Sequence, residues 1–122
     1  MKKAIVGFLL IGVRLWACTC EVANDSETLL ESTSAKGAEV IVRIPQRPVT
    51  ESSTKAFVCS DPLSKMDLWM PEHGHGSGPT KITESTEGCS TVERIKFLMK
   101  GKWELRLQFQ NKDTATVLVD VK

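Results

Sequence analysis

The sequence feature that most constrains the fold is a strictly alternating segment between residues 102 and 110. Its four large apolar residues are separated by charged or amide residues, and they are Trp103, Leu105, Leu107 and Phe109. Because successive side chains of a β-strand point to opposite faces, this pattern predicts a strand with one buried and one solvated face. We expect Trp103 to be a central packing residue.

Six further segments have the character of short β-strands. They are rich in β-branched or apolar residues and are bounded by turn residues such as Pro45, Pro62 and Asn111. These segments are 40–44, 54–60, 66–70, 80–83, 91–99 and 116–121. About seven short strands, with turns between them and no convincing helix, predict an all-β protein with an immunoglobulin-like β-sandwich fold.

The chain begins with the pattern of a bacterial export signal. Lys2 and Lys3 precede an apolar run from residue 4 to 13, which is too short to cross a hydrocarbon layer of about 30 Å. The following Leu-Trp-Ala-Cys resembles a lipobox and predicts a signal peptide over 1–17 with lipidation of Cys18. Trp16 and Arg14 depart from the usual pattern, so ordinary secretion and an uncleaved anchor are the alternatives. An extracytoplasmic location in the bacterial cell envelope is expected, with a lipid anchor in the membrane or, failing that, a periplasmic or secreted protein.

The segment 18–37 has the composition of a flexible tether. Glu, Ser, Thr, Asn and Ala dominate it, and such a composition buries too little apolar surface to order itself. A short helix around 27–32 is the alternative for part of it. The folded domain is therefore expected over 38–122. Without the first 17 residues the chain has 13 basic and 15 acidic residues, and this near-neutral balance gives no support for nucleic-acid binding.

Two of the four cysteines lie inside the expected domain. Cys59 and Cys89 flank the segment that carries both histidines. In an oxidising compartment they are candidates for a disulfide that would stabilise the domain by about 3 kcal/mol. Two buried, unpaired thiols are the alternative, and Cys20 would remain in the tether.

Both histidines of the chain lie in one glycine-rich segment, at positions 73 and 75. In an extended backbone, residues i and i+2 project to the same side, so His73 and His75 offer two imidazoles to one ion. Met66 and Met70 add thioethers nearby, and soft sulfur with imidazole favours copper over magnesium or calcium. The same segment, with Pro71 and Gly74, also fits an ordinary turn between two strands.

Two stretches together resemble the YtkA-like domain, a family of small exported bacterial domains. Residues 68–76 read Leu-Trp-Met-Pro-Glu-His-Gly-His-Gly, and residues 95–107 read Ile-Lys-Phe-Leu-Met-Lys-Gly-Lys-Trp-Glu-Leu-Arg-Leu. They are similar to the family's Met-Pro-x-x-Gly-His-Gly loop and its aromatic-x-Met-x-Gly-x-Trp segment. The resemblance covers 38–122 and implies an immunoglobulin-like sandwich associated with copper. It also implies that four side chains converge as metal ligands: Met70, His73, His75 and Met99.

Two classes of function follow from these patterns. The first is a membrane-tethered module that binds copper for extracytoplasmic copper handling or delivery. The second is a metal-free structural or interaction domain of a cell-envelope complex, with another envelope protein as its partner. An enzyme is not expected, because both histidines lie in one loop and no nucleophile–base order or phosphate loop is present. No small-molecule substrate is expected either.

Overall fold

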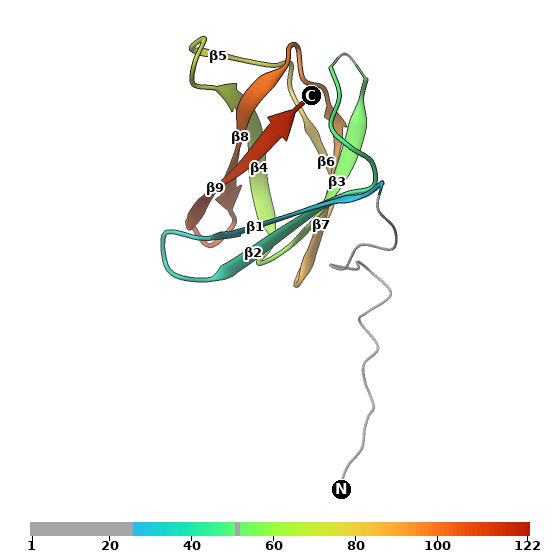
Figure 1. Ribbon diagram of the computed structural model, residues 1–122. Coiled ribbons are helices and arrows are strands. Elements are labelled where there is room, and N and C mark those ends of the chain that lie inside the picture. Colours follow the sequence, from blue (N-terminus) through green and yellow to red (C-terminus); the bar gives the residue numbers. More distant parts are fainter. Residues whose placement is uncertain (1–25, 51) are drawn as a thin grey trace, which may run out of the picture.

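The computed structural model describes residues 26–50 and 52–122 and shows a sandwich of two β-sheets (Figure 1). This part of the chain contains no helix, and therefore none long and apolar enough to cross a membrane. Its strands are β1 (Thr28–Thr33), β2 (Glu39–Ile44), β3 (Thr54–Cys59), β4 (Leu63–Met70), β5 (His75–Gly76), β6 (Lys81–Thr86), β7 (Cys89–Ile95), β8 (Gly101–Phe109) and β9 (Thr114–Val121).

The strand order is that of an immunoglobulin-like sandwich. One sheet has the order β1-β2-β3-β7-β6, and the other has the order β5-β4-β8-β9. All neighbouring strands are antiparallel. Without β1 and β5, the sheets β2-β3-β7-β6 and β4-β8-β9 follow the two-sheet order of a constant-type immunoglobulin domain. The predicted fold class is therefore confirmed, with two strands more than the seven expected.

The core lies between the sheets and is built by the alternation seen in the sequence. The four apolar residues of β8 are all buried, and Trp103 is fully so. The indole Nε1 of Trp103 donates a hydrogen bond to the carbonyl oxygen of Met99 (2.9 Å). This bond gives the buried indole N–H the acceptor that it needs. The Phe97 ring meets the Trp103 ring edge-on, with centroids 5.5 Å apart. Trp103 is thus a central packing residue, as predicted.

The expected tether over 18–37 is wrong in its second half. Residues 28–33 form β1, which pairs along its whole length with β2, from Thr28 opposite Ile44 to Thr33 opposite Glu39. The alternative of a short helix around 27–32 is also wrong, because residues 28–33 are extended. Leu30 of β1 packs against the core, so an available sheet edge orders a segment whose own composition does not. The expected signal peptide, Cys18 and Cys20 lie outside the described residues.

The carboxylate of Asp113 ties the loop after β1 to the turn between β8 and β9. Asp113 is 3% exposed and accepts hydrogen bonds from Ser34 Oγ (2.5 Å), the Lys36 amide (3.1 Å) and the Thr114 amide (2.9 Å). The Ser34 hydrogen bond, followed by those of the Thr114 and Lys36 amides, lowers the pKa of Asp113 against the opposing effect of burial. The charged carboxylate is therefore a structural link between β1 and the second sheet.

Cys59 ends β3 and Cys89 begins β7. Neither residue is a free thiol, so the alternative of two unpaired thiols is wrong. A bond between these two cysteines stays a prediction, because the other possible partners, Cys18 and Cys20, lie outside the described residues.

Candidate functional site

The histidine segment is a tight hairpin at the end of β4. The carbonyl oxygen of Met70 accepts hydrogen bonds from the amides of His73 (3.2 Å) and Gly74 (2.9 Å), and Gly74 takes a positive φ of 64°. The chain then returns as β5, in which His75 pairs with Met70 and Gly76 with Trp69. The backbone of this segment is therefore a turn between two strands, as the sequence pattern had indicated beside the metal-binding interpretation. This turn sets the positions of both histidines.

Gly76 allows β5 to lie against β4. A Cβ atom at this position would be 2.9 Å from the carbonyl oxygen of Leu68, whereas one at Gly78 would meet nothing within 4 Å. Carbon and oxygen atoms do not approach so closely, and the oxygen belongs to the backbone of a central strand. Of these two glycines, only Gly76 is required by close approach, and it directly follows His75.

The two imidazoles lie at a separation that suits one shared ion. The ring centroids of His73 and His75 are 5.9 Å apart. An ion about 2.1 Å from a ring nitrogen lies about 3.2 Å from the ring centre, so two rings on one ion have centres at most about 6.4 Å apart. The separation found here corresponds to an angle of about 135° at the ion. His73 is exposed and His75 is half-buried, so an ion held between them would lie near the surface.

A backbone contact leaves one nitrogen of His75 available to a ligand. Its Nδ1 lies 3.0 Å from the carbonyl oxygen of Gly76. A carbonyl oxygen only accepts hydrogen bonds, so Nδ1 carries the proton and the lone pair of the neutral ring is on Nε2. Metal-binding histidines commonly donate their second nitrogen to a carbonyl in this way, which fixes the tautomer and the ring orientation.

Aromatic rings continue from the loop into the core. The ring of Trp103 meets the ring of His75 edge-on, with centroids 5.8 Å apart, and Phe97 lies behind Trp103. Four rings from His73 to Phe97 therefore form a row from surface to interior. The contact between His75 and Trp103 was not predicted from the sequence, because the two residues are far apart along the chain and belong to different strands.

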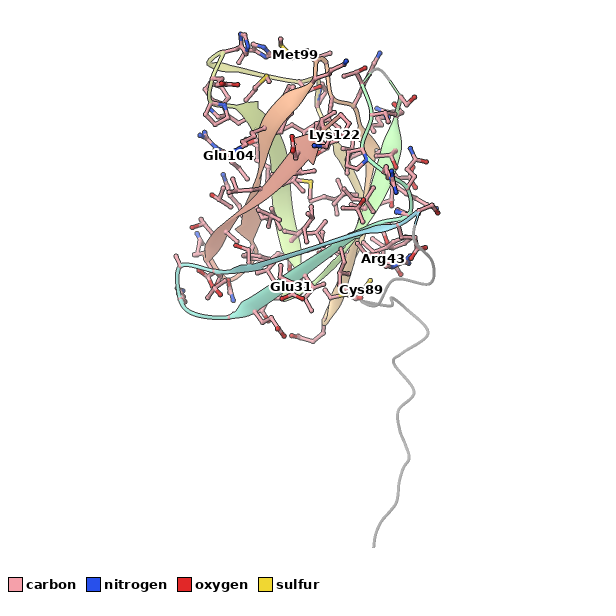
Figure 2. All side chains as sticks on the ribbon, in the orientation of Figure 1. Glu31, Arg43, Cys89, Met99, Glu104 and Lys122 are labelled. Atoms are coloured by element: carbon pink, nitrogen blue, oxygen red, sulfur yellow. The ribbon has the colours of Figure 1, made fainter. Side chains whose placement is uncertain are left out.

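The two candidate thioethers have different environments. Met70 is 1% exposed and belongs to the core, and its methyl group lies so close to Gly101 that a Cβ there would be 2.5 Å away. Met99 is half-buried against the core and lies at the end of the sandwich that carries β5 (Figure 2). Its carbonyl binds Trp103, the neighbour of His75. Met99 is therefore the more accessible of the two candidate sulfur ligands.

The loop offers mainly neutral ligands. Across the described residues, no group of three or more His, Cys, Asp or Glu side chains is placed to hold a metal ion. Glu72 is the one carboxylate between residues 71 and 80. Imidazole and thioether are thus the principal donors, and a site of this kind carries little negative charge.

Comparison with family models, curated proteins and solved structures finds no match for this chain. The resemblance to the YtkA-like domain therefore stays a prediction that rests on the two quoted motifs.

Proposed function

We propose that this domain binds copper at the His73–His75 loop and serves extracytoplasmic copper handling or delivery. The observation that carries the proposal is the pair of imidazoles whose ring centroids are 5.9 Å apart. The contact of His75 Nδ1 with the Gly76 carbonyl leaves the lone pair of His75 on Nε2, where it can bind a metal ion. Met99 is the more accessible of the two candidate thioethers, and Met70 is buried. The loop thereby offers two to four soft or intermediate donors to one ion.

The character of the ligands favours Cu(I). Thioethers and imidazoles prefer copper and zinc over hard cations, and thioethers add a preference for the monovalent ion. A divalent ion is better served by carboxylates, of which this loop has one, Glu72.

The setting of this function is also part of the proposal. The export signal and the lipid anchor at Cys18 would place the sandwich outside the cytoplasm and attach it to a membrane. There, copper would be passed between proteins rather than used in catalysis. The near-surface position of the loop supports transfer, because an ion between an exposed and a half-buried histidine is reachable by an incoming ligand.

Competition titrations with Cu(I) and Cu(II) on the purified full chain test the proposal. We expect His75→Ala to weaken Cu(I) binding by about tenfold or more, with a smaller loss for His73→Ala. Met99→Leu should cost more affinity than Met70→Leu, and leucine conserves volume in both cases. Acidification should weaken binding, because imidazole binds metal only when neutral. If the double histidine variant bound Cu(I) as tightly as wild type, the metal function would be refuted, and a metal-free interaction domain would replace it.

A further inference from the structure

The two ends of the sandwich differ in charge. Because the strands are antiparallel, the loops that follow β2, β4 and β7 meet at one end, together with the C-terminus (Figure 1). We call this the metal-loop end, since it carries His73 and His75. The turns after β1, β3, β6 and β8 meet at the opposite end.

The metal-loop end is strongly basic. Glu72 is the one exposed carboxylate among the described residues of its three loops and the two strand residues on either side. Glu93 lies one residue beyond, and exposed Asp120 of β9 lies opposite Lys102 and forms an ion pair with Lys122. Within the same limits the metal-loop end has seven exposed basic side chains, which are Arg47, Lys55, Lys81, Arg94, Lys96, Lys100 and Lys102.

At the opposite end, counted in the same way, the charged residues are exposed Lys36, Lys112, Glu39 and Glu87, half-buried Asp61 and buried Asp113. This end is therefore slightly acidic, so the near-neutral composition of the chain hides a charge dipole along the strands. A field of this kind steers approaching molecules of opposite charge toward the basic end.

Exposed apolar side chains lie inside the basic area. Val49 is 41% exposed and Leu98 is 48% exposed, and both belong to loops of the metal-loop end. A bridge between Thr50 and Phe97 holds these two loops side by side. Apolar side chains surrounded by charged ones are the usual composition of a protein-binding surface, in which the apolar centre gives affinity and the charged rim gives orientation.

A groove at the same end provides a place for an acidic side chain. Its volume is about 490 Å³, and its charged lining residues are two cations, Lys55 and Arg94, and one carboxylate, Glu93, beside the hydroxyl groups of Ser53 and Thr54. Arg94 has a positive φ of 65°, at an irregularity in the pairing of β3 with β7. A non-glycine residue in this conformation costs energy and persists where its surroundings fix it, so its backbone at the groove is held in place.

We infer that the metal-loop end is a docking surface for an acidic partner protein, which gives copper to the loop or takes it away. The inference rests on the proposed function. Copper passes between proteins by ligand exchange, so the surface around the loop must touch the partner, and its positive charge selects a negative one. A lipid surface offers no imidazole or thioether to receive the ion, which favours a protein as the occupant.

The test uses the metal-free full chain and a fluorescein-labelled peptide of eight glutamates, with binding followed by fluorescence anisotropy. We expect binding that weakens with added salt. Lys96→Glu combined with Lys100→Glu should weaken it by about tenfold or more. The matched control is Lys36→Glu with Lys112→Glu, which makes the same charge change at the opposite end and should have an effect below about threefold.

Two outcomes overturn the inference: no binding to wild type, or equal losses in both double variants. A third overturning outcome comes from pelleting the chain with vesicles of phosphatidylglycerol and phosphatidylcholine. If binding to vesicles depends on Lys96 and Lys100 while binding to the peptide does not, the metal-loop end is a membrane contact. Cu(I) titration of the Lys96→Glu, Lys100→Glu variant separates the two proposals, because docking should fall while copper affinity stays at the wild-type level. Unchanged Cu(I) affinity in the double histidine variant of a chain that still docks would refute the proposed function alone.

Discussion

Trp103 is the residue on which the core and the candidate site both depend. It is fully buried, its indole is hydrogen-bonded to Met99, and its edge meets His75. Truncating a buried Trp costs about 3–5 kcal/mol, so we expect Trp103→Ala to lower the denaturation midpoint in urea strongly. Trp69→Ala is the matched control, because Trp69 is half-buried under Arg106 on the outer face and should cost about 1 kcal/mol. Equal midpoints for wild type and Trp103→Ala would contradict the packing role.

Asp113 makes the stability of the fold depend on pH. Its pKa is lowered in the folded protein from an ordinary value of 3.8. The charged form therefore contributes stability that is fully present above about pH 3.8 and is lost as pH falls through the lowered pKa of the native state. Asp113→Asn should thus be less stable than wild type at pH 7, and the difference should shrink below about pH 3.8. Urea denaturation at both pH values measures it, with exposed Asp120→Asn as the control. A difference that is the same at both pH values would show that the charge has no such role.

Among the elements, β5 decides whether His75 is held in place. Its pairing with β4 requires that residue 76 have no side chain. We expect Gly76→Ala to weaken Cu(I) binding by about 10- to 100-fold, because it displaces the carbonyl that orients the His75 ring. Gly78→Ala changes the same loop without a clash and without a positive φ, so it should bind like wild type. Competition titration of the two variants makes the comparison, and equal affinities would contradict the role of β5.

The elements also show how far the sequence alone could lead. β8 was predictable because its alternation is unbroken, and the residues of Met66–Met70 that face the core could be identified by the same period of two. That period puts Met70 on the buried face with Met66 and Leu68, a point that the interpretation of Met70 as a metal ligand left out. β1 was not predictable, because Leu29 and Leu30 are adjacent rather than alternating, and its order comes from β2. The two residues of β5 are too few to form a pattern, and their pairing depends on the turn at Gly74.

At the scale of the whole molecule, the domain begins at β1 rather than at residue 38. β1 covers the edge of β2, and the loop after it supplies two of the hydrogen bonds to Asp113. We expect a chain that begins at Ala38 to be less stable than one that begins at Ser26 by about 2 kcal/mol or more, since it loses the packing of Leu30. Urea denaturation of both chains measures the difference. Equal stability would mean that β1 is only an accessory to the fold.

The position of the last strand has a practical consequence. β9 runs toward the metal-loop end, so Lys122 lies at the same end as β5 (Figures 1 and 2). Any segment joined after Lys122 emerges at the end of the sandwich that carries the two imidazoles. A polyhistidine purification tag placed there would add ring nitrogens at high local concentration and compete for the same ion. Affinity purification should therefore use a handle without histidine, or one that is cleaved before the first titration.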